Sequence, residues 1–346
     1  MKDKADRNAV LDAAKGVAII LVVFGHAIER NMVDPTNLWY WTAIHHFHME
    51  LFMLISGYLA YGKLDSKWLS RRFLQLIPTY IAWSFVLYYW SAFPFSGLGG
   101  IYPTNGGPII SLLKITASLN LSGLWFLPAL FALCTMMFII KGKPLPILAI
   151  TAVAYVISQS PMPQGFRFLN SSMSRIAWFM PFYAFGYFIA QYKNELYSYS
   201  FLKYIALVAF PVLFILGDHS WNHNYPIYSW GNYTILASGD IAFFFYRFIM
   251  SILGIGMTFA LLELFLKVVA VRRILCYFGF ITLGIYPAHL LWLKIGIGSG
   301  ITMVISATLI SLLLSVALIW LFQRVRITEY LLLGGAQKLR FGVLSS

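Results

Sequence analysis

The feature that most constrains this chain is its series of apolar segments long enough to cross a bilayer as helices. About 17 to 25 apolar residues span the hydrocarbon core. Ten segments approach that length: 13–33, 39–62, 73–93, 122–140, 145–160, 173–192, 201–217, 239–262, 274–293 and 299–322. Their continuous apolar runs lack the alternation of a membrane barrel. We therefore expect an all-α, polytopic transmembrane bundle of about ten helices.

Composition supports an integral membrane protein. Of the 346 residues, 60% are hydrophobic and 11% are charged, whereas a soluble domain carries about 25% charged residues. The two cysteines, Cys134 and Cys276, both lie inside apolar segments. They argue against a disulfide framework and against a cysteine-ligated metal.

The net charge of +13 indicates membrane topology rather than nucleic-acid binding. With the amino terminus inside, 19 of the 25 basic residues fall in inner segments and 6 in outer ones. The positive-inside rule then predicts that both termini are cytoplasmic. We expect a single integral membrane domain over residues 1–346, with outer loops near 94–121 and 218–238 forming a vestibule.

Lys15 and His26 lie eleven residues apart on the first apolar segment. In a helix this spacing places them within roughly 20° of one face, about 16 Å apart along the axis. Asp12 is suited to cap that helix, which would place Lys15 in the first turn, where free N–H groups bind anions. The alternative is that Asp12 is a simple cap and Lys15 a basic anchor at the membrane surface.

Glu50 and Arg247 are ionisable residues deep inside apolar segments, where charge is costly and usually functional. Counted from Lys63, Glu50 lies about 19 Å into its helix, and Arg247 lies about 12 Å from Gly239. Both depths are near that of His26, so the three residues could converge near the membrane centre. Chance alignment is the alternative.

Three histidines precede Glu50, and a metal site must be considered. His46 and Glu50 are an i, i+4 pair on one helical face, whereas His45 and His48 point elsewhere. No single helix therefore supplies three ligands. We expect no metal, and we expect these histidines to form hydrogen bonds or to contact a substrate.

Short motifs along nearly the whole chain make the sequence resemble the membrane-bound acyltransferase 3 family, whose members O-acylate surface and secreted glycans. The motifs are LDAAKG at 11–16, VVFGHA at 22–27, FHMELF at 47–52, ISGYL at 55–59, LWFL at 124–127, FY at 182–183, GY at 186–187 and IYPAH at 285–289. The basic residue, ten residues and histidine of the first two motifs are similar to the family signature.

The resemblance implies that His26 is the catalytic base and Lys15 its basic partner. Histidine suits this task near neutral pH. Glu50, where many members carry Asp and some carry Pro, would orient the imidazole, and Arg247 would contact the oxyanion or the acceptor. Direct transfer and an acyl-histidine intermediate both remain open.

The expected donor is cytoplasmic acetyl-CoA or another acyl-CoA, whose phosphates would meet Lys15, Arg71 and Arg72. No permanently bound cofactor and no metal are expected. The acceptor would be a glycan or lipid-linked saccharide entering from outside the bacterial inner membrane. Candidate acceptor contacts are Trp125, Arg175, Trp221, His223, Tyr286 and His289. Helix packing and the aromatic belt at the membrane surface are the competing interpretations.

The main alternative from another class is a transporter or flippase, because buried charge and glycine-broken helices suit a substrate pathway. The absence of a visible internal repeat argues against it. A small-molecule or pH sensor that uses the histidines is a third possibility. The acceptor glycan, the choice of acetyl or succinyl and the oligomeric state are not readable from the residues.

Overall fold

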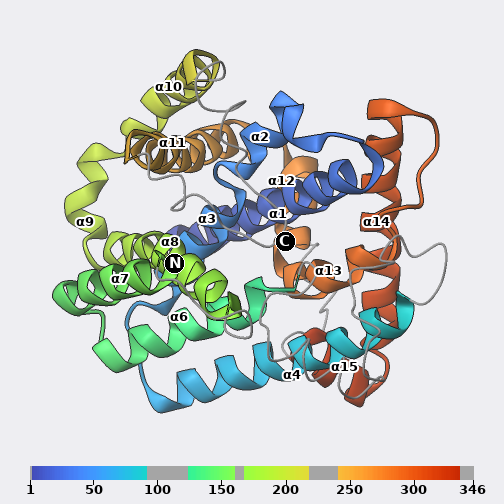
Figure 1. Cartoon of the computed structure of the whole chain (residues 1–346), viewed down its shortest axis with the longest axis horizontal. Coiled ribbons are helices and arrows are strands. Elements are labelled where there is room, and N and C mark those ends of the chain that lie inside the picture. Colours follow the sequence, from blue (N-terminus) through green and yellow to red (C-terminus); the bar gives the residue numbers. More distant parts are fainter. Residues whose placement is uncertain (1, 92–123, 160–166, 218–240, 336–346) are drawn as a thin grey trace. The chain divides into compact units, whose positions relative to one another are not determined.

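The structure is a computed structural model that describes residues 2–91, 124–159, 167–217 and 241–335 (Figure 1). Within these ranges the chain is helical and forms no strand. The expected all-α class is thus confirmed for the described residues.

The helices follow the apolar segments closely. Their bounds are α1 (Lys2–Asn31), η1 (Pro35–Asn37), α2 (Trp39–His45), α3 (His48–Ala60), α4 (Ser66–Trp90), α6 (Phe126–Ile140), α7 (Pro144–Gln159), α8 (Arg167–Gln191), α9 (Lys193–Leu196), η4 (Tyr197–Tyr199), α10 (Leu202–Gly217), α11 (Ile241–Phe265), α12 (Val269–Phe280), α13 (Thr282–Ala288), η6 (His289–Leu291), α14 (Gly300–Phe322) and α15 (Arg326–Leu333).

Among the described helices, three are long and apolar enough to cross a membrane: Ala9–Asn31, Phe244–Phe265 and Gly300–Phe322. A fourth candidate is the pair Val269–Phe280 and Thr282–Leu291, which is bent by 70°. The break falls at Ile281, between Gly279 and Gly284. The bundle of about ten spans and the sides of its termini stay predictions.

The start of α1 differs from the expectation. The helix begins at Lys2, so Asp12 lies inside it and does not cap it. Lys15 is consequently not in the first turn, and its neighbouring N–H groups are bonded within the helix. The apolar pattern missed this extension because the preceding residues are polar yet still favour helix.

The second apolar segment is also not one continuous helix. It breaks at His46 and Phe47: α2 ends at His45 and is capped by His46, and α3 begins at His48 after its N-cap Phe47. His46 and Glu50 therefore do not share a helical face, contrary to the i, i+4 expectation. The break was invisible in the sequence because this segment contains no proline or glycine before Gly57.

The chain divides into two compact units. Unit 1 comprises residues 1–33, 66–131 and 268–346, and unit 2 comprises residues 34–65 and 132–267.

In unit 1, α1 packs along α12 and also contacts α13 and α14 (Figure 1). Two glycines allow the close approach: a Cβ on Gly16 would collide with the backbone of Leu275, and one on Gly279 would collide with the backbone of Asp12. Small residues at helix crossings are typical of membrane bundles. This packing sets α1 beside the segment that carries His289.

In unit 2, α3 packs along α8, α7 also contacts α8, and α10 packs on α11. The α3–α8 crossing again uses glycine on both sides. A Cβ on Gly57 would meet the Tyr183 backbone, and one on Gly186 would meet the Leu54 backbone. The crossing places Trp178 of α8 against the start of α3.

Candidate active site

His26 of unit 1 is held by a carboxylate on its own helix. Its Nδ1 donates to Glu29 Oε2 at 2.8 Å, and the two side chains are 25% and 13% exposed. Residues three apart lie next to each other on a helix surface. Because the ionised carboxylate accepts the Nδ1 hydrogen, the neutral ring keeps a lone pair on Nε2. This is the arrangement of a histidine base oriented by an acid.

A second imidazole lies beside His26. The rings of His26 and His289 are 5.4 Å apart between centroids and are stacked at 21°. The His289 side chain is fully buried. Its backbone carbonyl accepts a hydrogen bond from Ser311 Oγ at 2.9 Å, which ties this turn to α14. Asn31 Nδ2 also donates to the carbonyl of Leu293 at 2.9 Å, which ties the end of α1 to the same segment.

The protonation pattern of His289 follows from its neighbours. Its Nδ1 lies 3.1 Å from the carbonyl oxygen of Ile285. A carbonyl has no hydrogen to give, so Nδ1 must be the donor and Nε2 carries the lone pair of the neutral ring. Among the described residues, Nε2 has no hydrogen-bond partner.

A row of aromatic rings leads from the two histidines to Trp125. Ring centroids are 6.3 Å apart between His289 and Tyr286, 5.6 Å between Tyr286 and Phe126, and 6.1 Å between Phe126 and Trp125. The Tyr286 hydroxyl also accepts a hydrogen bond from the Phe126 N–H at 3.3 Å. Four residues singled out in the sequence, His26, Trp125, Tyr286 and His289, thus lie in one cluster of unit 1.

The basic residues expected to bind phosphate are in different environments. Lys15 Nζ pairs with Asp12 Oδ1 at 2.6 Å, three residues away. Arg71 is exposed in α4 and bonds the carbonyl of Lys67. Arg72 donates to Gln75 Oε1 at 2.9 Å. No two of them converge through these contacts, so a shared phosphate site stays a prediction.

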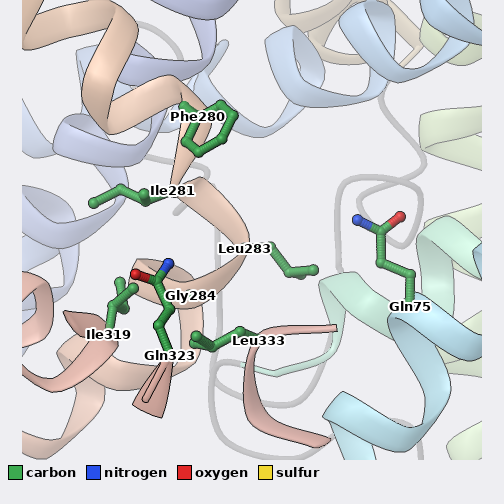
Figure 2. A pocket seen from close by; sticks show the side chains of 8 residues that line it. All are labelled: Gln75, Phe280, Ile281, Leu283, Gly284, Ile319, Gln323 and Leu333. Carbon is green, nitrogen blue, oxygen red and sulfur yellow. The ribbon is translucent and has the colours of Figure 1, made fainter. Parts of the chain in front are cut away.

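A small, open pocket lies in unit 1 at the bend between α12 and α13 (Figure 2). Its lining is apolar apart from the carboxamides of Gln75 and Gln323. The lining residues are Gln75, Phe280, Ile281, Leu283, Gly284, Ile319, Gln323 and Leu333. Because Arg72 bonds to Gln75, a guanidinium lies beside an apolar pocket that also offers amide groups.

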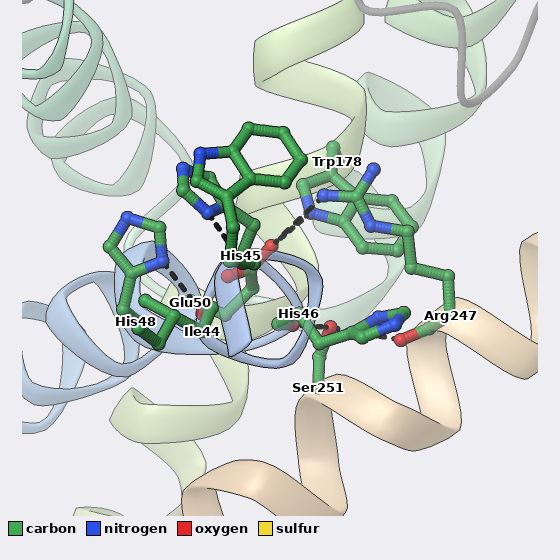
Figure 3. A network of polar contacts seen from close by, with 9 residues as sticks. Ile44, His45, His46, His48, Glu50, Trp178, Arg247 and Ser251 are labelled. Atoms are coloured by element: carbon green, nitrogen blue, oxygen red, sulfur yellow. Dashed lines mark hydrogen bonds and ion pairs between the residues drawn. The ribbon is translucent and has the colours of Figure 1, made fainter. Parts of the chain in front are cut away.

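Glu50 and Arg247 meet in unit 2 (Figure 3). Arg247 Nη2 is 3.8 Å from Glu50 Oε1, and both side chains are completely buried. Trp178 Nε1 donates to the same carboxylate oxygen at 2.7 Å, and the guanidinium carbon lies 4.8 Å from the centre of the Trp178 ring. The structure therefore brings together the two buried charges that the sequence placed at one depth.

The helix break supports this charged pair. Glu50 lies in the first turn of α3, where the positive end of the helix dipole favours a carboxylate. Ser251 Oγ donates to the carbonyl of His46 at 2.6 Å, which satisfies a backbone group at the break (Figure 3). Irregular backbone in an apolar segment requires such internal partners.

The histidines near Glu50 bond to backbone rather than forming a ligand set. Nδ1 of His45 donates to the Trp41 carbonyl and Nδ1 of His48 to the Ile44 carbonyl, both at 2.8 Å. No group of three metal-ligating side chains occurs in the described part of the chain.

Of the remaining predicted residues, one lies in the described part of the chain and two lie outside it. Arg175 is buried in unit 2, whereas Trp221 and His223 lie outside the described residues. His26 and Glu50 belong to different units, so their predicted pairing stays a prediction.

Two residues that contact the predicted ones, Glu29 and Trp178, were not predicted from the sequence. Glu29, the carboxylate partner of His26, could have been found from its i, i+3 spacing. Trp178, the partner of Glu50, could not, because it is distant in the chain and its approach depends on the α3–α8 crossing.

Comparison with known proteins agrees with the motifs. The family model described as an acyltransferase domain, acyltransferase 3, matches residues 8–324. Nodulation protein NolL of Mesorhizobium japonicum is 25% identical over 237 residues, which are 63% of this chain and 59% of that protein. NolL of Sinorhizobium fredii is 41% identical over 86 residues, which are 22% of this chain and 24% of that protein.

The chain thus spans less than two thirds of the length of the curated relatives it matches. No solved structure matches it. The family match covers both units, including His26, Glu29, Glu50, Arg247 and His289. By this match the chain belongs to the acyltransferase 3 family.

Proposed function

We propose that this protein is a membrane O-acyltransferase that moves an acetyl group from acetyl-CoA to a hydroxyl of a surface or secreted glycan. The observation that carries the proposal is the His26–Glu29 hydrogen bond, which leaves Nε2 as a base at the end of an aromatic row. The match to an acyltransferase domain supports the same reaction class.

In the proposed reaction His26 acts as general base and then as general acid. Nε2 takes the proton from the acceptor hydroxyl while that oxygen attacks the thioester carbonyl carbon. The C–S bond then breaks, and the imidazolium returns the proton to the departing CoA thiolate. Glu29 holds the ring in the required tautomer and faces the imidazolium that forms during the transfer.

The donor is proposed to approach from the cytoplasm. Lys15, Arg71 and Arg72 would contact its phosphates. The Lys15–Asp12 pair is partly exposed, and such pairs contribute only about 0.2–1 kcal/mol, so a phosphate can compete with Asp12 for Lys15. Beside Arg72, the small pocket at the α12–α13 bend offers the carboxamides of Gln75 and Gln323 as further contacts for the donor.

Glu50 and Arg247 are proposed to serve the reaction as a buried charged pair. Arg247 would stabilise the oxyanion or bind the acceptor, and Glu50 would hold Arg247 in place. Charge at these positions needs compensation in an apolar surrounding, which the 3.8 Å pairing supplies.

The acceptor is proposed to enter from the outer side along aromatic residues. Trp125, Tyr286 and His289 form the row that ends at His26. Arg175, Trp221 and His223 are further proposed contacts. Flat rings bind the apolar faces of sugars, and their polar edges bind hydroxyl groups.

The proposed setting is the bacterial inner membrane, with about ten spanning helices and both termini in the cytoplasm. The three long apolar helices and the bent pair support a membrane location. A cytoplasmic donor and an external acceptor require a protein that presents one site to both sides.

A transporter or flippase remains the second candidate, because two apolar segments are broken, one between α2 and α3 and one between α12 and α13. Broken helices occur at transporter binding sites. The two functions differ in one measurable respect, since only an acyltransferase breaks the thioester.

The test uses purified full-length protein in detergent with radiolabelled acetyl-CoA. We expect label to move to added glycan or to water, and we expect the His26→Ala variant to bind acetyl-CoA without releasing label. Retained release by folded His26→Ala would remove the proposed base. Failure of the parent protein to bind or turn over acetyl-CoA would refute the donor assignment.

A further inference from the structure

The lone pair of His289 is a feature that the reaction described above does not use. The imidazole is completely buried, and Nδ1 is committed to the Ile285 carbonyl. Nε2 has no partner among the described residues. A buried acceptor without a donor is costly, so such atoms in native proteins usually have a partner, often water or a ligand.

The chemistry of Nε2 restricts what can bind there. A neutral imidazole nitrogen that carries a lone pair accepts a hydrogen bond and cannot donate one. Carboxylates, phosphate dianions and carbonyl oxygens are therefore unsuitable partners. Suitable groups carry N–H or O–H: water, the hydroxyls of the acceptor and the amides of the donor.

The position of the ring favours a hydroxyl. His289 stacks on His26 with centroids 5.4 Å apart, and the planes are within 21° of parallel. Lone pairs on ring nitrogens lie in the ring plane, so stacked rings cannot bond to each other through them. The two imidazoles therefore offer two separate acceptors, on stacked rings, to a molecule that reaches His26.

We propose that these two acceptors select an acceptor molecule with two neighbouring hydroxyl groups, as on adjacent carbons of a pyranose. This inference rests on the proposed function. One hydroxyl loses its proton to His26 Nε2 as its oxygen forms the ester bond. The neighbouring hydroxyl keeps its proton, donates it to His289 Nε2 and holds the sugar in place. His289 is thus a specificity-determining contact for a vicinal diol, and it takes no proton in the transfer.

The test measures acetyl transfer from acetyl-CoA to three probes: trans-1,2-cyclohexanediol, 1,4-cyclohexanediol and cyclohexanol. The 1,2-diol should be the best acceptor of the parent protein, by about tenfold in kcat/KM, which is the effect of one hydrogen bond. The 1,4-diol controls for the number of hydroxyls, because it has two that are not adjacent.

The decisive variant is His289→Phe, which keeps a flat ring against His26 and removes the lone pair. This variant should raise KM for the 1,2-diol and leave KM for acetyl-CoA unchanged. Its kcat/KM should be similar for all three probes. His289→Gln, whose side-chain oxygen can accept, should recover part of the preference. A rise in KM for acetyl-CoA instead would assign Nε2 to a donor amide and overturn the inference.

A matched control is His45→Phe. His45 is also buried, also bonds through Nδ1 to a carbonyl four residues back and also stacks on an aromatic ring, Trp41. It should lose as much thermal stability as His289→Phe while keeping the preference for the 1,2-diol. Loss of the preference in His45→Phe as well would show a general effect of histidine replacement.

Different results would refute the diol proposal and the acyltransferase function on which it rests. If the parent protein turns over acetyl-CoA but acylates cyclohexanol as well as the 1,2-diol, the diol inference is wrong and the acyltransferase assignment stands. If acetyl-CoA is neither bound nor consumed, the proposed function fails first.

Discussion

Glu29 Oε2 accepts the Nδ1 hydrogen of His26 at 2.8 Å, one turn further along α1. Both residues belong to a single helix, and their spacing of three places them next to each other on its surface. If this carboxylate orients the base, Glu29→Gln should lower kcat by at least about tenfold, at the lower end of general acid–base contributions. KM for acetyl-CoA should not change.

Glu29→Asp should restore part of kcat, and Glu195→Gln on exposed α9 is the matched control. Unchanged kcat in Glu29→Gln would leave His26 without this positioning residue.

The buried pair of Glu50 and Arg247 can be tested by a double-mutant cycle in thermal unfolding. Removing one partner of a buried ion pair costs about 3–5 kcal/mol, because the other charge stays buried. Glu50→Gln and Arg247→Met should each destabilise the protein, whereas the double variant should lose much less than the sum. If the losses of unfolding free energy are additive, the two side chains, 3.8 Å apart, are not energetically coupled.

The α3–α8 crossing predicts a severe effect of a small substitution. A Cβ at position 57 would collide with the Tyr183 backbone, which cannot rotate away as a side chain can. Gly57→Ala should therefore cost about 1–3 kcal/mol through overpacking, measured as a lower Tm of the purified protein. The neighbouring Ser56→Ala provides the comparison. Equal Tm values for the two variants would contradict the close contact.

The proposed role of Lys15 predicts a charge effect on donor binding. Lys15→Glu should weaken acetyl-CoA binding strongly, whereas Lys15→Arg should retain it. Asp12→Asn should bind acetyl-CoA at least as tightly as the parent, because it frees Lys15 from its 2.6 Å partner. Isothermal titration of the detergent-solubilised proteins measures all three, and Lys193→Glu controls for net charge. Parent-like affinity in Lys15→Glu would make Lys15 a topology anchor.

Membrane topology is a separate prediction from the distribution of basic residues. Reporter fusions after Lys63, Lys141 and Lys193 should report the cytoplasm, because basic segments are retained inside. Fusions near Gly106 and Asn222 should report the outside. A cytoplasmic signal near Asn222 would reverse the acceptor side and contradict the proposed mechanism.

The candidate site was only partly predictable from the sequence: Glu50 could be identified, but the helix break before it could not. A charged side chain is costly inside an apolar segment, and this cost identified both Glu50 and Arg247 as candidate functional residues from the sequence. The helix that joins His46 to Glu50 was expected to be continuous, because no proline or glycine interrupts it. The break between α2 and α3 arises instead from tertiary partners such as Ser251, which bonds the carbonyl of His46.

The sequence by itself determined the helical class, the positions of most helices and the placement of Lys15 and His26 on one helix. These properties follow from local hydrophobicity and from the fixed geometry of helical turns. Only the tertiary structure decided that His289 stacks on His26, that Trp178 bonds Glu50 and that Arg247 pairs with it. Those contacts join residues far apart in the chain, and they depend on helix crossings whose geometry is set by close backbone approach at glycines such as Gly16 and Gly57.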